Sequence, residues 1–283
     1  MTGALTIAAH ALRESLRRRV FVVVLVLSVV FLGLYTWGAA ELFDDVDAFG
    51  DNEFGVEADT LAGATILGLA MFAILFLGSV LATFLTLGAV RGDAERGLLQ
   101  PLIVRPVGRF EYLLGRLLGA AAVSAAYVVV LFGACVVVTG LLGWWPDRVV
   151  APALSLAGAA VVIAALSLLA SALLSTTANG IAVFMALGAG LTAGLLGQIG
   201  EALDSRTLDR IADIGSWILP FEALYQHGLA RLTADVEGST AAIVNLGPFG
   251  GAQEASLAVW PFALAYVGAV IGLAALSFSR RDL

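Results

Sequence analysis

Residues 91–119 read RGDAERGLLQPLIVRPVGRFEYLLGRLLG, and they separate two long apolar runs with five arginines, Arg91, Arg96, Arg105, Arg109 and Arg116. About four to six residues are enough to connect two neighbouring helices, so a charged segment of this length is not needed merely to turn the chain. A short helix with charges on one face and leucines on the other would fit a groove of a soluble partner. The segment therefore predicts either a docking element or a connecting loop whose arginines only fix the topology.

The composition places the chain in the membrane. Of its 283 residues, 60% are hydrophobic and 13% are charged, and the mean hydropathy is +0.97. A soluble domain carries about 25% charged residues. An apolar run of about 20 residues is long enough to cross a bilayer as a helix. We therefore expect an all-α integral membrane protein with one helical domain, residues 20–283, and six spans at about 20–40, 61–90, 112–142, 149–174, 180–200 and 257–278.

The segments outside these spans differ in charge. Residues 1–19 place leucines and alanines at helical spacing and end in a cluster of arginines, Arg13, Arg17, Arg18 and Arg19. This pattern predicts an uncleaved amphipathic helix in the membrane interface rather than a signal peptide. Residues 41–60 carry eight carboxylates and no basic residue. Residues 201–256 form the longest non-membrane piece, for which we expect one or two short amphipathic helices on the membrane surface, with Trp217–Phe221 as the place where they could dip into it.

The arginines set the expected orientation. Six spans place both termini on one side of the membrane, together with residues 91–119. That side then holds 11 of the 15 arginines. Basic residues favour the cytoplasmic side. We therefore expect a multi-pass protein of the cell membrane with both termini in the cytoplasm and with residues 41–60 and 201–256 outside.

Several kinds of chemistry lack the residues that they need. The sequence contains no lysine, so it contains no Walker A phosphate loop and is not expected to be an ATPase. Its two histidines, His10 and His227, fall on opposite sides of the membrane, and Cys135 is the single cysteine, so no His/Cys metal site is expected. His227 is expected on a surface helix and Cys135 in an apolar interior. No charged residue lies well inside a predicted span, which disfavours transport through buried carboxylates.

Small and polar residues mark contacts between helices. Ser79, Thr83 and Thr86 share one face of the second span. They are candidates for lining a transport pathway, although such stripes more often join helices to one another. Gly190 and Gly194 form a Gly-x-x-x-Gly pair on the fifth span, which permits close backbone approach or bending. Gln198 is the most polar residue near the end of a span.

The segment between spans two and three resembles that of ABC-2 class permeases of ABC transporters. The matching motifs are Glu95-Arg96-Gly97-Leu98-Leu99, Pro106-Val107-Gly108-Arg109 and Leu113-Leu114-Gly115-Arg116. Leu98 stands where the class usually has Thr, and Arg116 stands where it usually has Lys. The motifs cover about thirty residues, whereas the layout of an N-terminal amphipathic "elbow", six spans and an extended stretch before the last span covers nearly the whole chain.

This resemblance implies a permease subunit of an ATP-driven exporter. Such a subunit pairs with a second copy of itself or with a sister permease, lies in membrane lipid and binds two ATPase subunits that carry ATP and Mg²⁺. Nucleic acid is not an expected partner, and no cofactor or metal is expected in this chain. The residues expected to contact the ATPases lie in the coupling segment, residues 91–110, and are Arg91, Asp93, Glu95, Arg96, Gly97, Leu98, Leu99, Arg105, Pro106 and Arg109. Within the class, the length and loop pattern are similar to the permease that serves nitrous oxide reductase copper-site maturation.

Two other functions remain open from the sequence. A membrane scaffold or assembly factor would use the same segment to bind a cytoplasmic partner and would move nothing. A secondary transporter or channel would give flux without any ATPase. The sequence leaves the substrate open.

Overall fold

The computed structural model describes residues 19–49, 57–89, 108–234 and 256–279, and every regular element in these ranges is a helix. Six of these helices are long and apolar enough to cross a membrane. They are α2 (Arg19–Phe49), α3 (Ala58–Thr86), α6 (Arg109–Leu141), α7 (Val150–Leu173), α8 (Thr176–Ala202) and α12 (Val259–Ser279). The predicted all-α fold with six spans is therefore confirmed. The side of the membrane on which the termini lie stays a prediction.

Several helix boundaries differ from the expected spans; α3, for example, covers Ala58–Thr86 rather than 61–90. Helix α2 continues to Phe49, so the first nine residues of the predicted acidic loop 41–60 are helical. A helix satisfies its own backbone hydrogen bonds, so it can continue beyond the bilayer, and Gly50, a poor helix former, follows its end. Helix α8 already begins at Thr176, within the expected link 175–179. Helix α6 begins at Arg109, three residues before the expected start of the third span.

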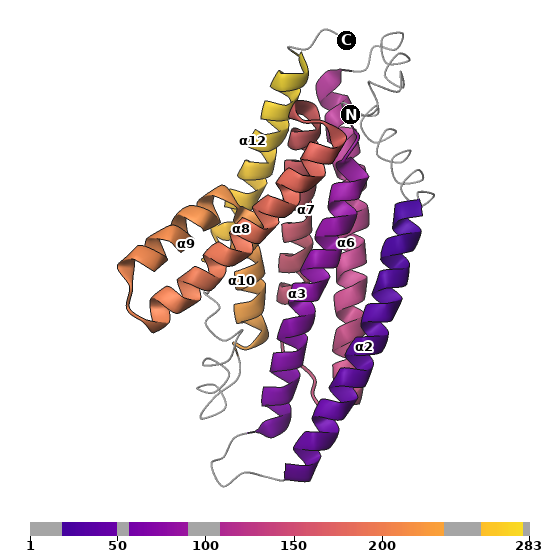
Figure 1. Cartoon of the computed structure of the whole chain (residues 1–283), viewed down its shortest axis with the longest axis vertical. Coiled ribbons are helices and arrows are strands. Elements are labelled where there is room, and N and C mark those ends of the chain that lie inside the picture. Colours follow the sequence, from indigo (N-terminus) through magenta and orange to yellow (C-terminus); the bar gives the residue numbers. More distant parts are fainter. Residues whose placement is uncertain (1–18, 50–56, 90–107, 235–255, 280–283) are drawn as a thin grey trace.

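Helix α7 is the centre of the bundle. It packs against α3, α6, α8 and α12 (Figure 1). In its most apolar stretch 67% of the residues are buried, compared with 17% in α2 at the edge of the bundle. The sequence of α7 is rich in alanine and serine, and such small side chains let neighbouring helices approach closely where lipid offers no hydrophobic drive for association.

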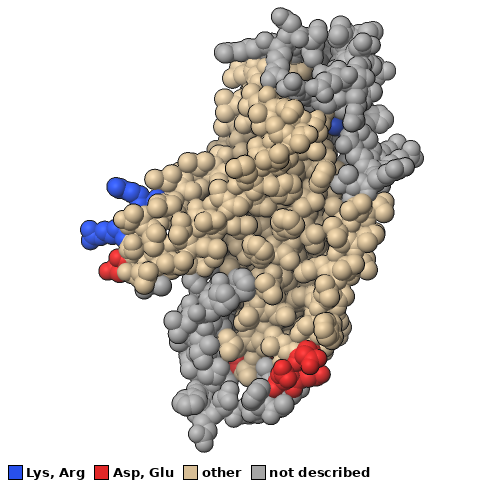
Figure 2. Space-filling view, in the orientation of Figure 1, with Lys and Arg blue, Asp and Glu red and all other residues tan. Residues whose placement is uncertain are grey.

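Helix α2 is held to α6 by two pairs of hydroxyl groups. Ser28 bonds Tyr127, and Tyr35 bonds Thr139, each with 2.5 Å between the oxygens. The opposite face of α2 is lined with exposed valine and leucine side chains. On the face of the molecule in Figure 2, charged side chains gather at α9 and at the lower end of the bundle, and the surface between them is uncharged. This surface suits a hydrocarbon environment.

Two shorter helices, α9 (Arg206–Ile218) and α10 (Pro220–Leu232), connect α8 to α12. Helix α9 runs back along α8. Two contacts show this arrangement: Gly200 lies against Asp209, and Gly215 lies against Ala193. Leu219 then separates the two short helices, since proline lacks an N–H and disfavours helical geometry in the residue before it. Helix α10 runs back beside α7 (Figure 1), and 11 of its 13 residues are buried. We call α9 and α10 together the α9–α10 hairpin.

The glycine pair of α8 forms the seat of this hairpin. A Cβ atom on Gly190 would lie 2.6 Å from Cζ of Phe221, and one on Gly194 would overlap Oε1 of Glu222. These two glycines therefore form a notch in α8, into which the first turn of α10 fits.

We predict that Gly194→Ala destabilises the protein and that Gly188→Ala on the same helix does not. The new methyl group at position 194 overlaps Glu222, and overpacking of this kind costs about 1–3 kcal/mol of unfolding free energy. A Cβ atom at position 188 would meet nothing within 4 Å, and replacing glycine in a helix with alanine gains about 0.5–1 kcal/mol. Thermal unfolding in detergent measures both variants. Equal unfolding temperatures for the two would contradict the notch.

Candidate functional site

The candidate site is the frame that holds the two ends of the predicted coupling segment. Helix α3 leads into this segment, and α6 follows it. Residues 90–107 lie outside the described residues, as does the side chain of Arg109, whose backbone begins α6. The predicted contacts at Arg91, Asp93, Glu95, Arg96, Gly97, Leu98, Leu99, Arg105 and Pro106 therefore stay predictions. The same holds for the elbow residues Arg13, Arg17 and Arg18 and for the side chain of Arg19.

A hydrogen bond joins the two ends of the frame. The Tyr112 hydroxyl in the first turn of α6 donates to the backbone oxygen of Ala89, which follows α3, at 2.7 Å. The tyrosine ring is buried, and its centre lies 6.5 Å from that of Phe278 near the end of α12. A hydrogen bond therefore joins the residue that precedes residues 90–111 to the residue that follows them.

Asn179 ties this frame to the rest of the bundle. It lies fully buried in the first turn of α8, and its Nδ2 donates to the backbone oxygens of Leu87 at 3.2 Å and Ser167 at 3.0 Å. One side chain thus connects the beginning of α8 to α7 and to the residue after α3. Between membrane helices there is little water to bond a backbone oxygen. The Asn179 amide supplies hydrogen bonds to two such oxygens instead.

The stripe of Ser79, Thr83 and Thr86 lies inside the chain. All three residues are buried. Ser79 donates to the backbone oxygen of Leu75 at 2.6 Å, and Thr86 donates to that of Ala82 at 3.0 Å. From α7, Ser167 donates to the backbone oxygen of Thr83 at 3.4 Å. This arrangement favours the interpretation as a contact between helices, and a role in lining a pathway stays a prediction.

A second polar cluster lies where the α9–α10 hairpin meets α8. Glu222 is only 4% exposed, and its Oε1 has no hydrogen-bond partner among the described residues. A side-chain hydrogen bond joins Glu222 to Gln226, whose Oε1 accepts a hydrogen bond from Nε2 of Gln198 at 3.2 Å. The Glu222 carboxyl group is on α10, which is not one of the spanning helices. Burial raises the pKa of Glu222 to about 7, and the hydrogen bond from Gln226 opposes this rise only in part.

This cluster was not predicted from the sequence. Residues 201–256 were expected on the membrane surface and His227 on a surface helix, whereas His227 is buried at 3% exposure. One sequence signal could have indicated the cluster. Glu222 and Gln226 are spaced to share one face of a helix, and a short helix that follows Leu-Pro can fold back into the bundle. Cys135 is buried in the interior, as expected.

We predict that Asn179→Ala lowers the free energy of unfolding by roughly 1 kcal/mol, because two interhelical hydrogen bonds are lost in a membrane interior. Thr192→Val is the matched control on the same helix. Thr192 is exposed, and its hydroxyl bonds only the backbone of its own helix at Gly188. Thermal unfolding in detergent should separate the two variants, and an unfolding temperature as high for Asn179→Ala as for Thr192→Val would remove Asn179 from the frame.

Comparison with known proteins agrees with this architecture. The 143 residues that match the "Probable ABC transporter permease protein NosY" of Stutzerimonas stutzeri are 32% identical to it and make up 50% of this chain and 47% of that protein. The match thus spans about half the length of this relative. The family model described as "ABC-2 family transporter protein" matches residues 5–283, which is nearly the whole chain. The chain therefore belongs to the ABC-2 family of ABC transporter permeases.

Proposed function

We propose that this chain is the membrane subunit of an ATP-driven exporter and that residues 91–110 couple it to two separate ATPase subunits. The observation that carries the proposal is the Tyr112–Ala89 hydrogen bond, which fixes the ends of a charged segment at one end of a membrane bundle. Family membership supports the role as a permease. The sequence contains no lysine, so the phosphate-binding loop belongs to the partner. The likeness to NosY favours the nitrous oxide reductase branch that the loop pattern suggests.

The frame gives the proposed coupling a physical route. When ATP draws the ATPase subunits together, the coupling segment is displaced, and Tyr112 and Ala89 pass the displacement to α6 and α3. Asn179 passes it to α8, because its amide holds Leu87 and Ser167 at once. The substrate would then pass along the interface with a second copy or a sister permease. The exposed apolar faces of α2 and α8 are available for that interface or for lipid.

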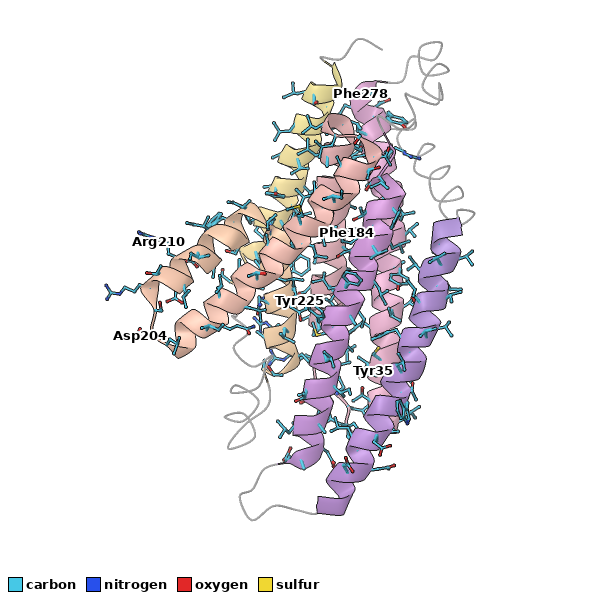
Figure 3. The ribbon with its side chains drawn as sticks, viewed as in Figure 1. Tyr35, Phe184, Asp204, Arg210, Tyr225 and Phe278 are labelled. Atoms are coloured by element: carbon cyan, nitrogen blue, oxygen red, sulfur yellow. The ribbon has the colours of Figure 1, made fainter. Side chains whose placement is uncertain are left out.

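We predict that Glu95→Arg and Arg96→Glu each weaken ATPase association about tenfold, which corresponds to about 1.4 kcal/mol, without lowering the unfolding temperature of the permease. Charge reversal replaces an attraction at the interface with a repulsion. Arg210→Glu is the control, since Arg210 is exposed on α9 (Figure 3). The measurement is a pull-down from native membranes in mild detergent with mass spectrometry. Unchanged recovery of the ATPase with both variants would overturn the coupling assignment, and a complex without any ATPase would favour a scaffold.

We also predict that Tyr112→Phe reduces ATP-driven transport while the ATPase stays bound. The variant loses the bond to Ala89 but keeps the buried ring, so α3 and α6 no longer move as a pair. Tyr266→Phe loses a comparable bond, from its hydroxyl to the backbone oxygen of Ile218 at 2.8 Å, near the α9–α10 hairpin. Each change costs about 1 kcal/mol of stability. The ratio of transport to ATP hydrolysis in liposomes should fall for Tyr112→Phe alone, and an equal ratio for both would refute the route.

A further inference from the structure

The Glu222 carboxyl lies deep in the bundle. It faces Gly194, which is eight residues before the end of α8 at Ala202, a distance of about 12 Å along the helix. On the other side of α10, Leu224 packs against the middle of α7, where a Cβ atom on Gly158 would lie 3.3 Å from Cδ1 of Leu224. A carboxylate buried at such a position is costly to keep ionised.

Neighbouring charges do not neutralise this carboxyl group. Among the described residues, Glu222 makes no ion pair, and Gln226 is its hydrogen-bond partner. Helix α7 has no ionisable side chain, and α3 and α8 have only Asp59 and Glu201, each near a helix end. The ionisable groups on the other packed elements are Tyr266 on α12, Arg206, Asp209, Arg210 and Asp213 on α9, and Tyr225, His227 and Arg231 on α10 itself.

The close packing limits what can occupy the free oxygen. Oε1 of Glu222 fills the space that a Cβ atom of Gly194 would take, and Nε2 of Gln226 lies 2.8 Å from that same position. A bulky ligand does not fit between α8 and α10 in this arrangement. A proton needs no added volume, and it removes the charge that burial penalises.

We propose that Glu222 is a proton-binding site of this permease and that its protonated form holds the α9–α10 hairpin in the notch of α8. Loss of the proton places an ionised carboxylate in the notch, so the hairpin is released from α8. The O–H bond of the carboxyl group breaks, and the proton passes to water, which reaches the notch as the hairpin leaves α8. This deepens the proposed function by making hairpin docking, and with it the transport cycle, dependent on pH.

The test is infrared difference spectroscopy of the full-length permease in lipid, recorded over a pH titration. A protonated carboxyl group has a C=O stretching band that a carboxylate lacks. We expect such a band in the wild type, with a midpoint at least about two pH units above the ordinary glutamate value of about 4.3. The band should be absent in Glu222→Gln and present in Asp213→Asn, whose original carboxyl is exposed on α9 of the same hairpin. A spectrum without any Glu222-dependent band would overturn the proposal.

A second variant keeps the test decisive if Glu222→Gln does not fold. Gln226→Leu keeps the carboxyl group and removes the hydrogen bond that favours its ionised form, so the midpoint should move to higher pH. A midpoint that stays unchanged or falls would count against the site.

Docking of the hairpin has its own readout. Amide hydrogen exchange of α10, corrected for the intrinsic effect of pH, should lose protection above the midpoint in the wild type and keep it in Glu222→Gln. The sign follows from linkage, because a folded-state pKa above the ordinary value means that the docked state binds more protons and weakens as pH rises. Equal protection at all pH values would refute the link between the proton and docking.

Neither experiment uses an ATPase, so the two proposals fail separately. A Glu222 band together with pH-dependent docking, in a permease that recovers no ATPase, would uphold the proton site and overturn the proposed function. A stable ATPase complex without the band would do the reverse.

Discussion

The fold depends on the rule that every backbone polar group inside a membrane must find a partner in the protein. The six spanning helices satisfy it alone, since each closes its own hydrogen bonds. The α9–α10 hairpin meets it differently, because its helices are interrupted at Leu219, a half-buried residue whose exposed neighbour is Ile218. Around that break Glu222 N–H donates to the oxygen of Leu219 at 3.0 Å, and Tyr266 donates to that of Ile218. At this break, therefore, a neighbouring helix supplies a partner for one of the backbone groups.

Contacts between helices use small residues and single polar side chains, because lipid is as apolar as leucine and gives no reason for helices to associate. The edge helix α2 is joined to α6 by Ser28 with Tyr127 and by Tyr35 with Thr139. The central helix α7 relies on alanine and serine, and α8 relies on its glycine notch. A few hydrogen bonds and close contacts between small residues therefore join particular pairs of helices.

The six spans could be predicted because a long, continuous apolar run has few stable structures other than a membrane-spanning helix. The ends of the spans were predicted less accurately. Carboxylates such as Asp44 can lie in the last turns of α2 as well as in a loop, so they do not mark the end of the helix. The contacts of Asn179 could not be predicted. Nothing in the neighbouring sequence shows that its amide bonds both α7 and the residue after α3. Glu222 and His227 were placed on the surface since polar residues on a 13-residue helix usually lie there. The Glu222 carboxyl group is buried against Gly194, which is far away in sequence.

Helix α8 connects the two polar sites of the bundle. Its first turn holds Asn179, which binds the end of α3, and its middle holds Gly194, which receives Glu222. A helix transmits displacement along its axis with little loss, because its backbone bonds are continuous. A shift of α8 by a fraction of an ångström at Asn179 would therefore change the fit at Gly194, where the contact with Glu222 has no spare space. By the same contact, an ionised Glu222 would press on α8 and bias the frame beside the coupling segment, so the effects of the two sites on each other must be reciprocal.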